Sequence, residues 1–342
     1  MASIAAPMPY LKVEGFAYTQ PNPYSEFISD WSSGYKGGNE AIQHSWLEVG
    51  VEYGNWGIAI IRQDYASLHF SEDTADFYYL SENRLPLTID YRYNIDITSN
   101  YTSLEGLRLF HRVVGNERNQ LTAALNFLKG KELLRGRLYG DVTVLAEDDY
   151  EFDQLKIDYY YSDDLLFDRV VEAPTGEGYS IDLYGSWQAT PQLLFDASLI
   201  NLLGHITWKN TPFTTAIITS DNKEYDSNGY VIVHPALSGK HETRRYRQEI
   251  PTIFKLNAQA TLTSQSQLLG ELITTNQHHF ISVGAGFKPS NGHQLKTLFT
   301  MQTHAITIAY QNNWLSSRIT LDNPELGKAR HLALQLNLQF PF

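Results

Sequence analysis

Apolar and polar residues alternate along several segments of the chain. Between positions 87 and 97, the odd-numbered residues are apolar or aromatic and the even-numbered residues are polar. The same alternation recurs over 254–262 and 332–340. Successive side chains of a β-strand point to opposite faces, so each segment predicts a strand with one apolar and one polar face. About 9–11 residues are enough for a tilted strand to cross a bilayer.

Two all-β architectures show this pattern, a soluble sandwich and a transmembrane barrel. The apolar faces here are long and almost free of charge, whereas the polar faces carry charges such as Arg135 and Arg137, opposite Leu134 and Leu138. A soluble core has no need to hide such residues. We therefore predict an all-β fold, a closed antiparallel transmembrane β-barrel over residues 1–342 as one domain. In the strand over 87–97, we expect the odd-numbered face to contact lipid and the even-numbered face to line the lumen.

The connections between the predicted strands alternate in length. Short turns are expected at 53–56, 98–101, 129–131, 189–192, 290–293 and 310–314, and longer polar segments at 20–45, 66–85, 147–153, 219–251 and 323–330. Short periplasmic turns and longer outer loops are typical of outer-membrane barrels. Counting segments gives about 16–18 strands. The alternative is 14 strands, if the weak segments at 165–171 and 295–301 are not strands.

Composition narrows the class of protein. The chain has no cysteine, which excludes disulfide scaffolds and zinc thiolate sites, and its 22 tyrosines and 6 tryptophans suit aromatic girdles at two membrane interfaces. A net charge of −12 argues against a nucleic-acid partner. The sequence has no run of about 18 apolar residues that would form a transmembrane helix. Residues 1–6 lack the features of a signal peptide, so we interpret the sequence as a mature chain.

The last strand ends in a phenylalanine preceded by alternating apolar residues. This ending resembles the C-terminal signal by which outer-membrane barrels are recognised by their assembly machinery. The resemblance implies that Phe340 and Phe342 act as the assembly signal. Pro341 departs from the pattern, because proline donates no hydrogen bond to a neighbouring strand.

A second resemblance covers the middle of the chain. The segments 176–183 and 197–208 are similar to patterns in fatty-acid-transporter-like and conjugation-associated barrel families. The resemblance implies a porin-like outer-membrane barrel. Some members of those families move hydrophobic molecules, and others serve in secretion or assembly.

Charged and amide residues on the polar faces form the predicted lumen lining. They are either a selectivity lining or a salt-bridge network that fills a narrow interior. These residues are Asp90, Arg92, Asn94, Asp96, Arg135, Arg137, Asp141, Asp158, Asp182, Lys255 and Asn257.

A basic cluster of Lys240, Arg244, Arg245 and Arg247 falls in the longest predicted outer loop. Three roles are open for this cluster: a constriction folded into the lumen, a contact to lipopolysaccharide phosphate, or a solvated loop. The predicted partners are outer-membrane lipid, lipopolysaccharide and the barrel assembly machinery. A surface or periplasmic protein is a further candidate partner.

We expect neither an enzyme nor a cofactor. None of the 11 histidines sits in a motif that identifies a nucleophile. The acidic stretch 221–229 has a calcium-loop composition without EF-hand spacing, so no metal site is predicted. The first strand is expected near Tyr10, which leaves no room for a plug domain or a periplasmic domain. The leading hypothesis is a bacterial outer-membrane channel for passive or facilitated passage of small solutes. The alternative is a non-conducting barrel that anchors or assists a secretion, conjugation or surface assembly.

Overall fold

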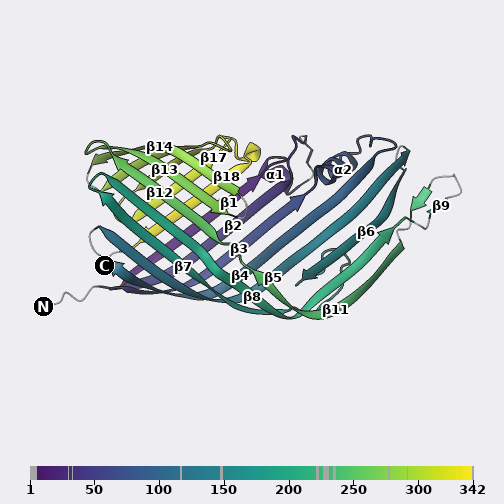
Figure 1. Ribbon diagram of the computed structural model, residues 1–342, viewed down its shortest axis with the longest axis horizontal. Helices are drawn as coiled ribbons and strands as arrows, with labels where there is room; N and C mark the ends of the chain where they lie inside the picture. The colour runs from purple at the N-terminus through teal and green to yellow at the C-terminus, as the bar shows by residue number, and fades with distance from the viewer. Residues whose placement is uncertain are drawn as a thin grey trace.

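A computed structural model describes residues 6–29, 31–32, 34–115, 118–146, 149–220, 223–225, 231–233, 236–275, 278–290 and 292–340 (Figure 1). Most of these residues belong to antiparallel strands. The strands are β1 (Met8–Thr19), β2 (Glu40–Tyr53), β3 (Trp56–Phe70), β4 (Arg92–Gly115), β5 (Asn119–Ala146), β6 (Asp149–Tyr161), β7 (Thr175–Thr190), β8 (Leu193–Thr219), β9 (Lys223–Tyr225), β10 (Val231–Val233), β11 (Ala236–Glu249), β12 (Ile253–Thr261), β13 (Ser266–Thr275), β14 (His278–Ser290), β15 (His293–Thr300), β16 (Ile306–Gln311), β17 (Leu315–Leu321) and β18 (His331–Gln339). The helices are α1 (Tyr24–Phe27), α2 (Glu72–Glu82) and the 3-10 turn η1 (Leu326–Lys328).

Fourteen strands close into a barrel. The ring runs β1-β2-β3-β4-β5-β7-β8-β12 and returns through β13 to β18, which pairs with β1. Closure leaves no free edge at membrane depth, where unpaired backbone groups are costly. The predicted closed antiparallel barrel is confirmed. Its 14 strands match the alternative count and not the expected 16–18.

The difference between 14 strands and the expected 16–18 has a topological reason. Strands β6 and β7 follow each other along one position of the wall, since both pair with β5 on one side and β8 on the other. Strands β11 and β12 likewise share a position beside β8. Each pair of segments therefore counts once around the barrel. Of the two weak segments, 165–171 contains no strand, whereas β15 occupies most of 295–301.

Three strands are far longer than the others and rise out of the barrel on one side. Strands β4, β5 and β8 contain 24, 28 and 27 residues. The short turns expected at 98–101 and 129–131 are therefore wrong, because these residues lie within β4 and β5. The outer halves of the three long strands pair with β6 and β11 to form a curved sheet, here called the extension, at the right of Figure 1. The basic residues of 240–247 lie in β11 of this sheet, so the predicted loop at 219–251 is wrong over that stretch.

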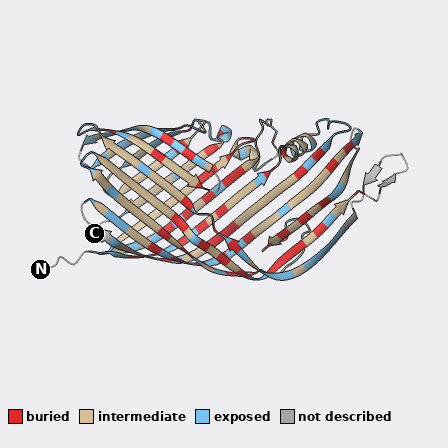
Figure 2. Cartoon of the chain, viewed as in Figure 1, coloured by how far each residue is buried: buried red, intermediate tan, exposed pale blue. Residues whose placement is uncertain are grey.

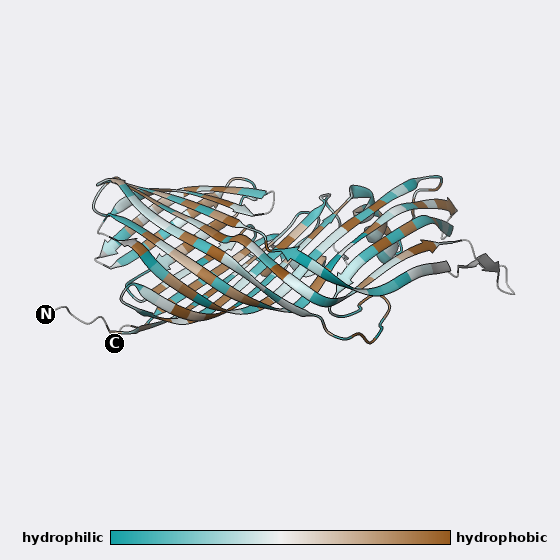
Figure 3. Cartoon of the chain, turned by 60° about the horizontal axis from the view of Figure 1, so that its bottom comes forward, coloured by the Kyte–Doolittle hydropathy of each residue, from teal (hydrophilic) through white to brown (hydrophobic). Residues whose placement is uncertain are grey.

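The barrel wall turns an apolar face outward. On β3, for example, Ile58 and Ile60 are 50% and 70% exposed, while the alternate residues Ala59 and Ile61 are buried. Figure 3 shows this alternation of hydrophobic and hydrophilic positions along the barrel strands. Trp56, Trp187 and Trp314 are exposed beside short turns at one end. An apolar band with aromatic residues at its boundary is the outer surface that a lipid-embedded barrel requires. Within the described residues, no helix combines the length and hydropathy needed to span a bilayer.

The extension has its own core on the face that continues the outer face of the barrel. Tyr93 and Ile95 of β4 pack with Val142 and Val144 of β5, and Phe77 of α2 covers them. Helix α2 is held there by Asp73, whose carboxylate accepts a hydrogen bond from the Asn94 backbone N–H at 2.8 Å. Figure 2 shows buried residues continuing from the barrel into this region.

This core corrects the expectation for the strand at 87–97. Strand β4 begins only at Arg92, and Asp90 lies in a turn with φ 59°. Tyr93 and Ile95 point to the expected side of the sheet but contact protein, not lipid, because this part of β4 lies above the apolar band.

Candidate functional site: the barrel lumen

The barrel encloses a cavity of about 690 Å³ that is lined from nearly every strand of the ring. Its wall includes Gln120, Gln311 and Gln339, which lie at or next to the short-turn ends of their strands. The cavity therefore reaches the periplasmic end of the barrel. Most of the lining side chains are polar or charged, as expected for the inner face of an outer-membrane barrel.

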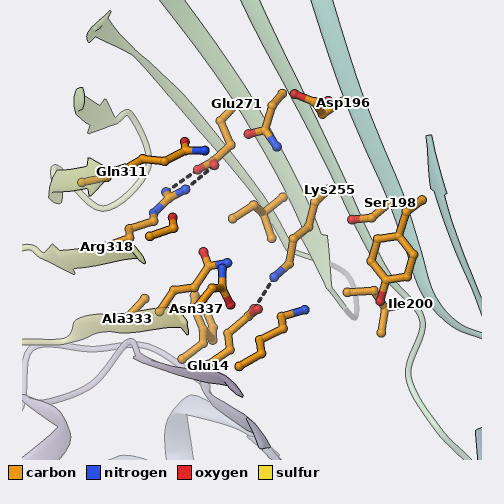
Figure 4. A pocket seen from close by; sticks show the side chains of 18 of the residues that line it. Glu14, Asp196, Ser198, Ile200, Lys255, Glu271, Gln311, Arg318, Ala333 and Asn337 are labelled. Carbon is orange, nitrogen blue, oxygen red and sulfur yellow. Dashed lines mark hydrogen bonds and ion pairs between the residues drawn. The ribbon is translucent and has the colours of Figure 1, made fainter. Parts of the chain in front are cut away.

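An ion pair crosses this cavity. Glu14 on β1 and Lys255 on β12 bind each other, although seven strand steps separate β1 and β12 in either direction around the ring (Figure 4). The two strands are therefore on opposite walls. His44 on β2 lies 3.3 Å from the same Glu14 carboxylate. The pair therefore spans the lumen from one wall to the other.

A second ion pair stands beside the first. Arg318 on β17 donates two hydrogen bonds to Glu271 on β13, one of them at 2.5 Å (Figure 4). This bidentate interaction between an arginine and a carboxylate is a strong geometry for a buried charge pair. Asp196 and Lys296 line the same cavity. Positive and negative groups are thus interleaved around the lumen, which gives it no single sign of charge.

Arg108 on β4 anchors a third group of polar side chains in the wall. Its guanidinium lies 3.3 Å from Glu48 on β2 and also binds Asp182 on β7. Glu48 in turn accepts hydrogen bonds from Tyr10 at 2.6 Å and from Trp46 at 2.9 Å. Both carboxylates thus have partners inside the barrel, and the network holds the inner faces of β1, β2, β4 and β7 together.

An apolar cluster closes the outer end of the lumen below the extension. Trp208 of β8 is fully buried and packs with Ile61, Leu104 and Ile250. The Trp208 Nε1–H donates to Gln248 at 2.9 Å, and Gln248 donates to Asn100 of β4 at 2.8 Å. We call this cluster the neck. These hydrogen bonds link β11 to β4 through side chains on the inner face of the sheet.

On the opposite side of the outer end, aromatic and imidazole side chains meet across the lumen. The Phe16 ring of β1 lies 5.5 Å from the Phe280 ring of β14, measured between centroids. His278 of β14 binds Glu40 of β2. Together with the neck, these contacts fill part of the outer end of the lumen.

The predicted lumen residues fall in two places. Lys255 and Asn257 line the cavity, and Asp182 belongs to the Arg108 network. The others lie in or beside the extension, above the cavity. Arg92, Asn94 and Asp96 share the face of β4 that carries Arg108. Their side chains, however, pair with neighbours in the extension, as in the Arg137–Asp96 bond at 2.6 Å. The residues of the extension are Asp90, Arg92, Asn94, Asp96, Arg135, Arg137, Asp141 and Asp158.

The basic cluster lies away from the cavity. Lys240 and Arg244 bind Glu242, and Arg245 and Arg247 are exposed on β11. Of the assembly signal, Phe342 lies outside the described residues. Phe340 is exposed, and its backbone N–H donates to the Pro9 carbonyl of β1 at 2.9 Å.

Sequence reasoning missed four central charges: Glu14, Arg108, Glu271 and Arg318. Each is a charged residue in a stretch of alternating polar and apolar positions, so the alternation indicates that it lies on the polar face of its strand. Nothing in the pattern gives its partner in the ion pair, because the residues of the Arg108–Asp182, Glu14–Lys255 and Glu271–Arg318 pairs are 47 to 241 positions apart along the chain.

Comparison with known proteins gives matches among solved structures only. Neither a protein-family model nor a curated protein matches the chain. A mutant of the monoaromatic hydrocarbon channel TodX is 8% identical with a TM-score of 0.46, over 98% of this chain and 89% of that one. A FadL homologue of Pseudomonas aeruginosa is 8% identical with a TM-score of 0.39, over 98% and 90%. The translocator domain of the autotransporter NalP from Neisseria meningitidis is 9% identical with a TM-score of 0.32, over 100% and 90%.

The class of the protein follows from the closed barrel and its apolar outer band. This chain is a β-barrel protein of the bacterial outer membrane.

Proposed function

We propose that this protein is an outer-membrane channel for small solutes, with a gated lumen. The observation that supports it best is the polar cavity of about 690 Å³ inside a closed wall, reaching the periplasmic end. The space is occupied by paired side chains rather than by a packed apolar core. Side-chain ion pairs can separate without breaking the strand ladder, so the wall survives while the path opens.

The Glu14–Lys255 pair is the inner gate in this proposal. It joins opposite walls, so its separation widens the path more than the loss of any pair between near neighbours. The interleaved charges favour small polar or dipolar solutes over ions of one sign. The neck at Trp208 and the Phe16–Phe280 contact form the outer gate.

Single-channel recording in planar bilayers tests the proposal. The double variant Glu14→Gln/Lys255→Met removes both charges, so neither remains unpaired in the lumen. We expect conductance steps in the unaltered protein and a higher conductance or open probability in the variant. Arg92→Gln/Asp141→Asn is the matched control, because it removes an ion pair of 2.7 Å in the extension and leaves the lumen intact.

Folded protein without conductance steps in either form, and without solute uptake into liposomes, would reject the channel. Equal effects of the lumen variant and the control would reject the gate while keeping the channel.

The second candidate is a non-conducting barrel that anchors a surface or periplasmic assembly. It is favoured by the side chains that fill part of the outer end and by the extension, whose polar face presents charged residues such as Arg92 and Asp153 to solvent. Co-purification from native membranes separates the two functions. A stable partner together with absent conductance supports the anchor, and a barrel that always purifies alone opposes it.

A further inference from the structure

A row of polar side chains crosses the outer surface where the barrel meets the extension. Strand registers align Glu105 of β4 with Lys129 of β5, then with Glu177 of β7, Thr207 of β8 and Arg247 of β11. Each residue lies on the outward face of its strand, because the neighbouring inward positions, such as Ile206 and Gln248, are buried. We call these five residues the boundary row.

The boundary row lies directly above the apolar band. Phe127 and Tyr179, two residues nearer the periplasm on β5 and β7, are 49% and 45% exposed. Leu203, four residues nearer the periplasm on β8, is 69% exposed. These large apolar side chains face lipid tails, so the row is at the depth of the outer-leaflet headgroups.

Ion pairs leave some of the cations near this row without an acidic partner. Lys131 binds Glu105 at 3.2 Å, and Lys209 binds Glu177 at 3.1 Å. These pairs neutralise the two carboxylates of the row. Among the described residues, Lys129, Arg245 and Arg247 form no ion pair at this boundary.

The backbone of β11 presents Arg245 and Arg247 on the same side of the strand. The register with β8 shifts between Arg244 and Tyr246, which places Arg245 at an irregularity opposite the Lys209–Asn210 region. Arg245 and Arg247 are both exposed on the outward side, while Gln248 between Arg247 and Glu249 is buried. Glu249 lies two residues further along the same face and is the nearest acidic neighbour of Arg247 in β11.

We propose that Arg245 and Arg247, with Lys129 three strands away along the row, bind phosphate groups of the lipopolysaccharide that surrounds the barrel. Guanidinium groups bind phosphate in a bidentate manner, and a lysine adds a point charge. Neighbouring strands are about 4.8 Å apart, so Lys129 and Arg247 are separated by three spacings, roughly 14 Å. This separation gives one phosphate contact at Lys129 and one at the two arginines. The site is independent of whether the lumen conducts.

Binding of lipid A to the full-length folded barrel in detergent tests the proposal. The probes are phosphorylated lipid A, chemically dephosphorylated lipid A and inorganic phosphate. We expect phosphorylated lipid A to bind and to raise the thermal midpoint, and dephosphorylated lipid A to bind at least about tenfold more weakly, as the loss of charged hydrogen bonds predicts. Arg245→Gln/Arg247→Gln should lower the affinity for phosphorylated lipid A by a similar factor.

A matched variant separates this site from general attraction to positive charge. Arg92→Gln/Arg137→Gln removes two arginines of the extension that are also exposed. These two arginines lie on the opposite face of the sheet, the one that continues the inner face of the barrel. This double variant should leave lipid A binding unchanged, and both variants should keep the gel mobility of a folded barrel. Equal loss in both double variants, or equal binding of the two lipid A forms, overturns the proposal. Full competition by millimolar inorganic phosphate would also overturn it, since the site would then be one for free phosphate.

Discussion

The Trp208 indole occupies the space that a side chain at Gly176 would need. A Cβ added at Gly176 would lie 2.7 Å from Trp208 Cε3. Glycine on β7 therefore lets the largest side chain of the neck lie flat against the neighbouring strand. The packing of the neck depends on this fit between two strands.

Replacing Trp208 with alanine should open the neck. Truncation of a buried tryptophan costs about 3–5 kcal/mol of folding free energy, and it also leaves Gln248 without its indole donor. We expect a lower urea midpoint and a higher conductance. Trp187→Ala is the control, because Trp187 is exposed on the outside of the barrel. A change in conductance of the same size in both variants would contradict the assignment of the neck.

Substitution by arginine should be damaging at one residue of β4 and tolerated at the next. Tyr93 is 3% exposed in the core under α2, so Tyr93→Arg should destabilise the extension by several kcal/mol, about the cost of losing a large core side chain. Asn94 is exposed beside Asp141, so Asn94→Arg should be tolerated.

The measurement is limited proteolysis together with gel mobility of unboiled samples. The Tyr93→Arg protein should be cleaved in the extension while its barrel stays resistant to SDS. Loss of SDS resistance would mean that the extension and barrel do not unfold separately.

The barrel itself should be heat-modifiable. Every strand of the ring is paired on both sides, so SDS has no free edge from which to unravel the wall. Boiled and unboiled samples should migrate differently on a gel. Identical migration of folded material would be incompatible with a closed ring.

Segment 162–171 should stay anchored down to mildly acidic pH. The buried Asp164 carboxylate accepts hydrogen bonds from Tyr159 at 2.6 Å and Arg169 at 2.5 Å. Burial raises the pKa of Asp164, but the hydrogen bonds from Tyr159 and Arg169 outweigh it, and the net pKa lies below the usual range. The stabilisation is therefore complete above the unfolded pKa of about 3.9 and is lost as the pH falls through the lower folded value.

Hydrogen exchange over 162–171, corrected for intrinsic rates, measures this anchoring. Protection should be constant from pH 8 to about pH 5 and should decline only below about pH 4. Asp164→Asn should reduce protection at neutral pH, since charged hydrogen bonds contribute about 1.5–3 kcal/mol. Asp163→Asn, at the exposed neighbour, should not. Loss of protection already near pH 6 would show that another group holds the segment.

Alternation along the chain was enough to predict the barrel and the faces of several of its strands. Lys255 and Asn257 alternate with apolar residues such as Leu256, which predicts that they face the lumen. Both residues line the cavity. This inference works because the pleat of a strand has a period of two wherever one face meets lipid and the other meets water.

Only the tertiary structure decided which alternating segments lie in the membrane. Tyr93 and Leu109 share one face of β4, yet Tyr93 is covered by α2 and Leu109 is 39% exposed on the barrel. An apolar face looks the same in sequence whether a helix or a lipid tail covers it.

The pairing of the lumen charges was also beyond the sequence. Glu14 and Lys255 are 241 residues apart, and they meet only because ring closure puts β1 and β12 on opposite walls of one lumen. Local alternation fixes the side of the sheet to which a residue points. The partner that it meets there depends on how many strands close the ring and on how far each rises above the membrane, and both are properties of the whole assembled wall.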